Sequence, residues 1–551
     1  MAVVVKKVRK LGAGGGQPPG DRAASALRPY FAEKTPACSR ACPNHQDVRA
    51  ALMTLALAES HGKTAERALE EAFYLLADRN PLPASCGRTC LHQCEKQCTR
   101  AQVDEPVAIH CVERAVGDFA LERRLPLRPL TKERHPERIA IIGSGPASLS
   151  CAYQLARRGY PVSVFEAFPQ PGGMLRYGIP AYRLPREVLE AEIARLPTLG
   201  VEFRCNTAVG RDVAYEDLRR DYAAIFVGIR AQPAVRLGLP GEEAPNVLSA
   251  AGFLHRVNTG EPPDLEETVV VIGGGDTAVD AARVATRLGA RATILCRRTA
   301  LEMPAIREEV EEAHREGVRI EGPAAPSAVV VENRRATGLT CKRLPLAGAE
   351  ASDSEFFLGA STIIVAAKPE RDSTGLEALC REGGAITVDE HDETAVPGTF
   401  AVPDDLDLGI VSTAIYRGRQ VAETIHSRFR GVPVEAATPP PVITHDKMRL
   451  DYYYYPKRPR VSVATVPVAE RLQAPEREVS LGLTPEEAIA EAKRCMSCGL
   501  CFQCDNCWQY CQEQAIVRPA EKGGAYRIKL EFCTGCKKCA EECPCGYIEM
   551  R

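Results

Sequence analysis

The sequence is 551 residues long and carries a formal net charge of −2, and this length suits roughly three to five domains. Because positive and negative charges nearly balance, nothing in the composition supports binding to nucleic acid or to an anionic membrane surface. The 23 cysteines fall largely in short C-x2-C steps, which favour metal–sulfur ligation in a reducing compartment over the disulfides of a secreted protein.

The amino-terminal segment lacks the pattern of a secretion signal. Its charges follow a very short apolar run, Met1–Val5, which is the wrong order for a signal peptide. No apolar run reaches the roughly 18 residues of a membrane span, so we expect a soluble cytoplasmic protein. Residues 1–35 hold Gly-Ala-Gly-Gly-Gly at 12–16 and predict a flexible extension, or one that docks on a partner.

A cysteine-rich region, residues 36–134, predicts a helical iron–sulfur domain. Its first pair, Cys38-x3-Cys42, precedes an Ala/Leu/Glu-rich stretch over Val48–Asp78 that predicts two helices. The second group of thiols is Cys86, Cys90, Cys94 and Cys98. Thiolates at such close steps can surround one cubane cluster, because each iron takes one protein ligand. A zinc site or unligated thiols are the alternatives, although no His-x3-His pair lies nearby.

Residues 135–265 begin with a dinucleotide-binding unit. An apolar strand, Ile139–Ile142, leads into a glycine turn and an Ala/Leu-rich helix, and a second strand, Val162–Phe165, ends in an acid. The glycines allow a tight turn and a close approach of pyrophosphate to the helix N-terminus, while the acid can hold the ribose hydroxyls. The third small position is a serine where the pattern has glycine. The residues expected to bind this dinucleotide are Gly143, Gly145, Ser148 and Glu166.

Residues 266–370 contain a second unit of the same kind. A buried strand, Thr268–Ile272, precedes the turn, a helix is predicted over Val279–Leu288, and the next strand, Ala292–Cys296, ends in two arginines. Guanidinium groups pair with the 2′-phosphate of NADP, which favours NADPH. A solvated basic strand end is the alternative, and NADH users can also carry arginines here. The residues expected to bind this nucleotide are Gly273, Gly275, Asp276, Thr277, Ala278, Arg297 and Arg298.

Two such units, the second inserted into the first, predict an α/β flavoprotein with two dinucleotide-binding domains. We expect the chain to return to the FAD-binding domain over residues 371–430. Pro397–Ala401 fits that return, and Ser412–Ala414 would open the last helix. Residues 431–490 form a predicted linker, in which Tyr452–Tyr455 favours packing over an interaction surface. Thr484, with Glu three residues later, predicts a capped helix start.

Residues 491–551 carry the cysteine spacing of a bacterial two-cluster ferredoxin and predict an α+β domain of that kind. In this spacing the fourth cysteine of each run ligates the other cluster. The two expected ligand sets are Cys501, Cys504, Cys507 and Cys543, and Cys533, Cys536, Cys539 and Cys511. Cys495, Cys498 and Cys545 are surplus to the pattern. The first two could ligate something, shift the register, or only cap a helix end.

The cysteine-rich region resembles a known family. Its Cys-x3-Cys-Pro step, Asn80–Pro83, Cys86-Gly-Arg-Thr-Cys90 and Cys94-Glu-Lys-Gln-Cys98 are similar to the small subunit of glutamate synthase and to the iron–sulfur flavin half of dihydropyrimidine dehydrogenase. The resemblance covers about residues 36–430 and implies two N-terminal [4Fe–4S] clusters. One would be held by Cys42, Cys90, Cys94 and Glu113. The other would include Cys38 and Cys98, but the family's two further cysteines lie upstream of Cys38, where this chain has none; Cys86 or Cys111 could substitute.

The same resemblance extends to the segments around the nucleotides. Pro171–Pro185 is similar to the family's segment beneath the FAD, which implies that Met174 and Arg183 touch the flavin nucleotide. Ala366 would lie near the nicotinamide. Asp405 would match the family's aspartate at the flavin phosphate and ribityl chain, although the glycine that precedes it in the family is missing here.

These features together predict an NAD(P)H:ferredoxin-type oxidoreductase that uses FAD, NADP(H) or NAD(H), and [4Fe–4S] clusters. Hydride would pass from NADPH to the flavin and leave as single electrons through the clusters, chemistry that the cofactors carry. The expected partner is a ferredoxin or an iron–sulfur redox enzyme in a larger complex. The added ferredoxin module resembles the NAD(P)H oxidoreductase linked to dissimilatory sulfite reductase and electron-transfer subunits of 2-oxoacid:ferredoxin oxidoreductases. A glutamate synthase small subunit with an extra module, or an electron-transfer scaffold without independent turnover, are the alternatives.

Overall fold

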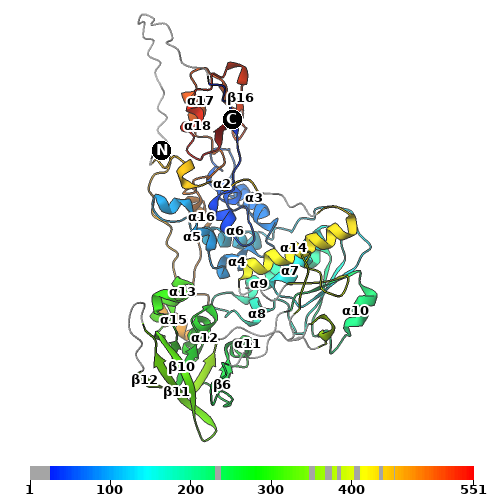
Figure 1. The fold of residues 1–551 in the computed structure, drawn as a ribbon, viewed down its shortest axis with the longest axis vertical. Coiled ribbons are helices and arrows are strands. Elements are labelled where there is room, and N and C mark those ends of the chain that lie inside the picture. The colour runs from blue at the N-terminus through cyan, green and yellow to red at the C-terminus, as the bar shows by residue number, and fades with distance from the viewer. Residues whose placement is uncertain are drawn as a thin grey trace, which may run out of the picture.

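The computed structural model describes residues 25–229, 237–345, 354–366, 375–380, 386–402, 410–433, 439–451 and 453–551. Figure 1 shows an elongated molecule in which a helical N-terminal region, drawn in blue, lies at the centre. Two α/β domains lie beside and below it, and a small C-terminal module, drawn in red, lies above it. In the described ranges no helix is both long enough and apolar enough to cross a membrane.

The first α/β domain is a parallel sheet covered by helices. Its elements are β2 (Ile139–Ile142), α7 (Pro146–Arg157), β3 (Val162–Phe165), α8 (Met174–Tyr177), α9 (Arg186–Ile193), β4 (Val201–Arg204), α10 (Tyr215–Asp221), β5 (Ala224–Val227), β14 (Thr399–Ala401) and α14 (Val411–Arg430). The strand order is β14-β5-β2-β3-β4, and the predicted strands β2 and β3 are confirmed. Because side chains alternate along a strand, Ile139 and Ile141 share a core with α7 and α14, whereas Ala140 and Ile142 share one with α10.

The second α/β domain is inserted between β5 and β14. Its elements are β6 (Val247–Ser249), α11 (Ala250–Asn258), β7 (Thr268–Ile272), α12 (Asp276–Arg287), β8 (Arg291–Leu295), α13 (Arg307–Arg315), β9 (Arg319–Glu321), β10 (Ala324–Glu332), β11 (Arg335–Arg343), β12 (Glu355–Gly359) and β13 (Thr362–Val365). A parallel sheet of order β6-β13-β7-β8-β9 packs against the antiparallel sheet β10-β11-β12. The domain boundary placed at residue 266 is too late, because β6 pairs with β13 and therefore belongs to this second sheet.

The helical N-terminal region joins the first α/β domain through α4. Its helices are α1 (Ala37–Ala41), α2 (Val48–Ala56), α3 (Ala65–Ala77), α4 (Pro83–Thr89), α5 (Gln93–Lys96) and α6 (Ile109–Glu122). The two helices predicted between residues 48 and 78 are confirmed as α2 and α3. Helices α4 and α6 cross closely, because a Cβ atom on Gly117 would lie only 2.4 Å from Ala84 N. The buried Glu192 carboxylate of α9 accepts hydrogen bonds from Ala84 N and Ser85 N at the start of α4.

Helices of the linker pack on the second α/β domain and on the helical N-terminal region. Helix α15 (Val468–Gln473) lies on the second α/β domain, where Arg471 pairs with Glu316, and α16 (Pro485–Ala492) packs on α2 and α6. The predicted cap is confirmed, since Thr484 and Glu487 form a reciprocal capping box. Tyr455 is buried in one hydrophobic cluster with Met496, whereas Tyr453 is 82% exposed, so the predicted packing is confirmed for Tyr455 and not for Tyr453.

The C-terminal module is completed by the other end of the chain. It contains α17 (Asn506–Tyr510), β15 (Ile516–Val517), β16 (Arg527–Ile528), α18 (Lys538–Glu541) and β17 (Ile548–Met550). Strand β1 (Pro29–Phe31) pairs antiparallel with β17, and Phe31 stacks on Tyr547 with ring centroids 5.3 Å apart. The assignment of these residues to a flexible extension is therefore wrong, since they complete a sheet. Residues 1–24 lie outside the described residues.

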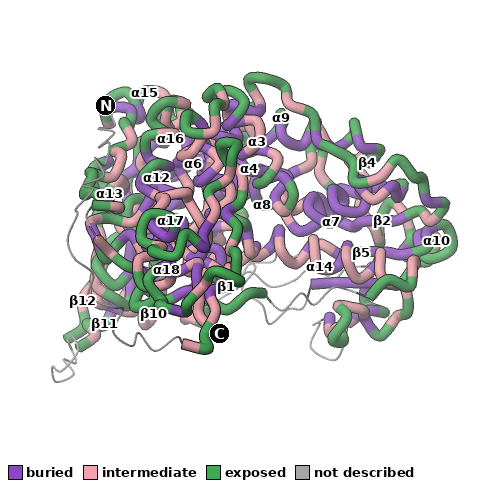
Figure 2. Tube along the Cα trace, turned by 90° about the horizontal axis from the view of Figure 1, so that it is seen from above, coloured by how far each residue is buried: buried purple, intermediate pink, exposed green. Residues whose placement is uncertain are grey.

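Figure 2 shows buried residues along α7 and β2 of the first α/β domain, while α10 is exposed at the edge of that domain.

Candidate redox-cofactor sites

The first glycine turn leaves open space where a pyrophosphate would approach. Gly143 has φ +86°, a conformation that favours glycine. Gly145 is the N-cap of α7, and no side chain caps that helix. A Cβ atom on Gly145 would meet nothing nearer than Gly228 O, at 3.9 Å. The free N–H groups of α7 and this open approach fit the phosphates of a dinucleotide.

The carboxylate of Glu166 lies against this turn at the end of β3. Glu166 is buried and accepts hydrogen bonds from Ser144 N and Phe168 N, both at 2.9 Å, and from the Ser144 hydroxyl. The predicted acid therefore stands beside the predicted phosphate turn. Ser148 lies one helical turn further along α7, where its small side chain packs over Gly228: a Cβ atom there would lie 1.9 Å from Ser148 Oγ. This contact explains why the third position of the pattern must be small.

The segment expected beneath the flavin shows two different environments. Gly173 packs on Gly145, since a Cβ atom at Gly173 would lie 2.7 Å from Gly145 Cα, and the neighbouring Met174 side chain is exposed. Arg183 is instead buried against the second α/β domain, and its Nη1 lies 2.6 Å from Asp280 Oδ2 of α12. Contact of Met174 and Arg183 with FAD stays a prediction. Asp405 lies outside the described residues.

The second glycine turn repeats the first arrangement. Gly273 has φ +148° and packs against Ala366 and Ala278, whose atoms would lie 3.0 and 3.3 Å from a Cβ atom there. Gly275 is the N-cap of α12 and has no neighbouring atom within 4 Å of a Cβ position. The turn is therefore closed by small residues on one side and open at the helix N-terminus, as a phosphate site requires.

Of the side chains around the second turn, one is hydrogen-bonded within the protein and three are exposed. Asp276 Oδ1 accepts a hydrogen bond from Ile306 N at 2.9 Å, so this carboxylate holds the start of α13. Thr277 is exposed on the first turn of α12. Arg297 and Arg298 follow β8, are exposed, and make no ion pair within the described part of the chain. Two exposed guanidinium groups at this strand end have the charge that would suit a phosphate dianion, and their binding to a nucleotide stays a prediction.

A first thiol cavity lies between the helical region and α14. It is lined by Cys42, Cys86, Cys90, Cys94 and Glu113. Glu113 Oε1 accepts a hydrogen bond from Asn80 Nδ2 at 2.9 Å, and burial raises the pKa of Glu113 to about 8. A hydrogen bond from Cys86 lowers the pKa of Cys90 below its ordinary value. Ser412, at the start of α14, also lines the cavity, and its Oγ lies 3.8 Å from Cys90 Sγ. The predicted ligands Cys42, Cys90, Cys94 and Glu113 thus share one cavity with Cys86.

A second thiol cavity combines residues from distant parts of the chain. It is lined by Cys38, Cys98, Cys495 and Cys498. The alternative that Cys86 or Cys111 joins Cys38 and Cys98 does not match the structure, because Cys86 lines the first cavity and Cys111 Sγ lies 3.1 Å from His110 Nε2. The position of Cys495 and Cys498 beside Cys38 and Cys98 was not predicted, because these two pairs lie far apart in the sequence. The signal in the sequence was a C-x2-C step, Cys495 and Cys498, that belongs to neither four-cysteine ferredoxin run.

The C-terminal module holds two further thiol cavities. The third is lined by Cys501, Cys504, Cys507 and Cys543, together with Cys545, and the fourth by Cys511, Cys533, Cys536 and Cys539. These are the two sets that the spacing predicts, with the fourth cysteine of each run crossing to the other set. Four thiols around one cavity fit a [4Fe–4S] cluster, whose irons take one protein ligand each.

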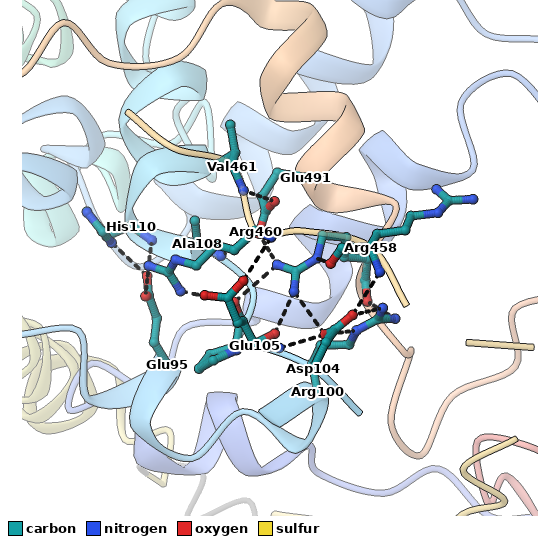
Figure 3. A network of polar contacts seen from close by, with 12 residues as sticks. Glu95, Arg100, Asp104, Glu105, Ala108, His110, Arg458, Arg460, Val461 and Glu491 are labelled. Atoms are coloured by element: carbon teal, nitrogen blue, oxygen red, sulfur yellow. Dashed lines mark hydrogen bonds and ion pairs between the residues drawn. The ribbon is translucent and has the colours of Figure 1, made fainter. Parts of the chain in front are cut away.

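A network of buried charges holds the linker against the cysteine-rich region (Figure 3). Arg494 is buried, and it lies 3.0 Å from Asp104 Oδ1 and 2.6 Å from Glu491 Oε1. Glu491 in turn accepts hydrogen bonds from Ala108 N and Val461 N. Each carboxylate oxygen therefore has a donor, as buried charges require. The network fixes the segment that carries Cys495 and Cys498 beside the segment that carries Cys98.

Glu95 and His110, which are labelled in Figure 3, belong to a second polar group that was missed from the sequence. His92, Glu95 and His110 bring three ligand atoms within 4.8 Å of one another. Glu95 is already paired, since Arg460 lies 2.6 Å from its Oε2 and His110 Nδ1 lies 2.7 Å from its Oε1. Although burial opposes both shifts, the hydrogen bond between these two groups lowers the pKa of Glu95 to about 2 and helps to raise that of His110 to about 10. This geometry favours an ion-paired anchor over a metal site.

Comparison with known proteins agrees with this arrangement. Residues 137–418 match the pyridine nucleotide-disulphide oxidoreductase family, and residues 21–125 match domain II of dihydropyrimidine dehydrogenase, a 4Fe–4S cluster domain. The beta subunit of the NADP(+)-dependent formate dehydrogenase of Moorella thermoacetica is 36% identical over 84% of this chain and 70% of its own length. The Escherichia coli glutamate synthase [NADPH] small chain is 34% identical over 74% of this chain and 89% of its own.

A third relative is the beta subunit of a Geobacter sulfurreducens NADPH-Fe(3+) oxidoreductase, 35% identical over 64% of this chain. This chain spans only 54% of that relative's length. The family match covers both glycine turns, and the cluster-domain match covers the thiols of the first cavity together with Cys38 and Cys98. The chain therefore belongs to the pyridine nucleotide-disulphide oxidoreductase family, as an FAD- and iron–sulfur-dependent NAD(P)H oxidoreductase.

Proposed function

We propose that this protein passes electrons between NADPH and the redox centre of a partner protein, through FAD and [4Fe–4S] clusters. The observation that carries the proposal is the order of the sites along the molecule. The second α/β domain lies at one end, the first α/β domain and the helical region lie between, and the C-terminal module with its two thiol cavities lies at the other end (Figure 1). Such an order suits a relay from a nucleotide to an external acceptor.

The two nucleotide sites have separate tasks in this proposal. Gly145 and the α7 N-terminus would hold the FAD phosphates, and Glu166 would hold its ribose. Gly275 would admit the NADPH phosphates, while Arg297 and Arg298 would bind the 2′-phosphate that distinguishes NADPH from NADH. When bound, the flavin accepts a hydride and releases electrons one at a time. Binding and orientation of the two nucleotides are what this chain's residues supply.

The route towards the acceptor would begin at the start of α14. Ser412 belongs to the first α/β domain and lines the first thiol cavity, so its contact with Cys90 places the proposed flavin-binding domain beside the first set of thiols. Glu113 and the cysteines of that cavity would hold the first cluster. The third and fourth thiol cavities would hold the two ferredoxin-type clusters and present them to the partner.

The relatives support a role inside a larger complex. Two of them are named as beta subunits, one of an NADP(+)-dependent formate dehydrogenase and one of an NADPH-Fe(3+) oxidoreductase. We therefore propose an iron–sulfur redox enzyme or a ferredoxin as the partner. The similarity to a glutamate synthase [NADPH] small chain favours a second candidate, an electron-donating subunit of a glutamate synthase. Co-purification with a glutaminase and synthase chain would select that candidate.

Anaerobic titration of the full chain tests the proposal. NADPH should bleach the flavin absorbance rapidly, and cluster signals should then appear in the EPR spectrum. NADH should act more slowly. Bleaching by neither nucleotide would contradict the proposal. A flavin that is reduced while every cluster stays oxidised would limit the chain to the reverse direction, in which a reduced partner supplies electrons to NADP+, and dithionite-reduced ferredoxin should then drive NADPH formation.

A further inference from the structure

The cysteines left over from the ferredoxin spacing have a place in the structure. Cys495 and Cys498 follow α16 and line the second thiol cavity with Cys38 and Cys98. We infer that these four cysteines ligate one [4Fe–4S] cluster, shared between the two ends of the chain. The role of this cluster in electron transfer rests on the proposed function, but the identity of its ligands does not.

The four thiols of the second cavity come from three separate pieces of backbone. Cys38 lies in α1, Cys98 directly precedes the short turn Thr99–Gln102, and Cys495 and Cys498 come from the far end of the chain. All four thiols are partly buried. Between them the walls are mostly apolar, with Leu52, Val107 and Ile109. Thiolates converging on a dry cavity are what an iron–sulfur cluster needs, because solvent access and hydrogen bonds control its stability and potential.

One buried donor lining this cavity has no acceptor. Arg49 is 4% exposed and its Nη1 donates to Lys34 O at 2.7 Å and to Cys498 O at 2.9 Å. Its Nε is buried without a hydrogen-bond partner. Buried polar groups are almost always hydrogen-bonded, so an exception calls for an explanation. The sulfide and thiolate sulfurs of a cluster would supply an acceptor, and the guanidinium charge would offset the negative charge of such a group.

The spacing of the thiols favours a cluster over zinc. A tetrahedral zinc ion with Zn–S bonds of about 2.3 Å holds its four sulfurs about 3.8 Å apart. Among the described residues, the group whose three ligand atoms all lie within 4.8 Å of one another is His92, Glu95 and His110. Within the described ranges, no three sulfurs of the second cavity lie that close together. A cubane cluster places each thiolate on a different iron and therefore accepts wider spacing.

The second cavity lies between the first and third cavities, where the inferred cluster could transfer electrons from one to the other. Leu52 and Ile109 line both the first and the second cavity, so the two cavities share a wall. Cys498 lies three residues before Cys501 of the third cavity, which limits the separation of their Cα atoms to about 11 Å. Cys498 and Phe502, which lines the third cavity, also pack against the same cluster of hydrophobic side chains. The inferred cluster would therefore connect the flavin side of the molecule with the C-terminal module.

Single substitutions at opposite ends of the chain test the inference. Cys38→Ala and Cys498→Ala should each lose one cluster equivalent of iron and acid-labile sulfide per FAD. Both variants should lose the same component of the dithionite-reduced EPR and Mössbauer spectra, because both ligands belong to one cluster. Cys205→Ala, which removes a partly exposed thiol of the first α/β domain, is the matched control and should retain every component. Retained FAD verifies that the variants are folded.

The wild-type chain gives a second measurement that needs no substitution. Anaerobically purified protein should contain iron and sulfide for four clusters and no stoichiometric zinc. Iron for three clusters together with one zinc ion would overturn the inference, as would different spectral components lost in Cys38→Ala and Cys498→Ala, or an unchanged iron content in both. These readouts do not depend on NADPH, so they separate this inference from the proposed function, which fails only if nucleotides cannot reduce the flavin.

Discussion

The guanidinium of Arg183 and the carboxylate of Asp280 form a buried ion pair of 2.6 Å that joins the two α/β domains. Arg183 follows α8 in the first domain, and Asp280 lies on α12 in the second. Tyr182 OH adds a hydrogen bond to Asp280 Oδ1 at 3.2 Å. Burial lowers the pKa of Arg183, but Asp280 and Glu309 more than compensate and raise it. Burial raises the pKa of Asp280 to about 6 even beside Arg183, so the pair is charged at neutral pH and fixes one domain against the other.

Replacing Arg183 with alanine should destabilise the protein strongly. Removal of one partner leaves a buried charge without compensation, which costs about 3–5 kcal/mol. The free energy of unfolding, measured by urea denaturation, should fall by that amount. Arg204→Ala, at an exposed pair with Glu202, should cost at most about 1 kcal/mol.

The double variant Arg183→Leu/Asp280→Leu distinguishes the ion pair from a flavin contact. If the ion pair is what matters, removal of both charges should recover most of the lost stability. If Arg183 acts mainly through FAD, the double variant would stay as unstable as Arg183→Ala and would retain less FAD.

Alanine at the two helix-capping glycines should block nucleotides without harming the fold. Neither Gly145→Ala nor Gly275→Ala meets a close neighbour in the protein, so each apoprotein should unfold at nearly the wild-type temperature. The new methyl group would occupy the space that the pyrophosphate needs. We expect Gly145→Ala to purify without FAD, and Gly275→Ala to bind NADPH at least ten-fold more weakly by isothermal titration calorimetry.

Gly418→Ala provides the contrasting case for these glycines. There a Cβ atom would lie 1.9 Å from Ala147 O, because α14 crosses α7 at this point. This variant should lower the unfolding temperature before any nucleotide is added. Equal effects of Gly418→Ala and Gly145→Ala on the apoprotein would argue against an open phosphate site.

Substitution of Arg297 and Arg298 should change the choice of nucleotide. A hydrogen bond to a charged group contributes about 1.5–3 kcal/mol, so Arg297→Ala/Arg298→Ala should lower kcat/KM for NADPH by about ten- to a hundred-fold. The value for NADH should change by less than about two-fold, since NADH has no 2′-phosphate. Arg291→Ala removes an exposed arginine at the start of the same strand and should leave both values unchanged. A parallel loss with NADPH and NADH would remove the argument for phosphate recognition.

Glu316 anchors the linker, and its replacement by glutamine should loosen it. The Glu316 side chain is fully buried and lies within 3.1 Å of Arg283, Arg287 and Arg471. Neutralising this carboxylate removes a negative charge that compensates three buried guanidinium groups. Glu316→Gln should therefore lower the free energy of unfolding, measured in urea, by about 3–5 kcal/mol. Glu311→Gln, at an exposed pair with Arg307, should cost less than about 1 kcal/mol.

The contribution of Glu316 should also depend on pH. Burial raises its pKa, but hydrogen bonds from Arg283 and the charges of Arg283 and Arg287 outweigh burial and hold the pKa below the ordinary value of 4.5. The ionised form is therefore favoured by folding. Its contribution should be fully present above about pH 4.5 and should disappear as the pH falls through the lower folded pKa. The stability gap between wild type and Glu316→Gln should narrow over that acidic range and stay constant at neutral pH.

The parts of this molecule that could be predicted are those in which neighbouring residues determine the structure. A buried run followed by glycines predicts β2 with its turn, and Thr484 with Glu487 predicts the start of α16, because these interactions span a few residues. The fourth cysteine of each ferredoxin run could be assigned to the opposite set because that exchange belongs to the spacing itself.

The parts that could not be predicted depend on contacts between distant segments. Cys498 has its cavity partners near the other end of the chain, and no local spacing reports that distance. Strand β1 needs β17 before its hydrogen bonds can form, so Pro29–Phe31 alone gives no strand signal. The ion pair of Arg183 could not be predicted, because Asp280 lies on a helix of the other domain.

The pairing of β1 with β17 has a consequence for how the molecule is made. Strand β1 emerges from the ribosome long before β17, so its edge waits without a partner while both α/β domains fold. Cys38 and Cys98 wait in the same way for Cys495 and Cys498. The central helices and the C-terminal module can therefore be joined in this way only after β17 has been synthesised. Assembly of the inferred cluster in the second thiol cavity would then have to wait until Cys498 has been synthesised.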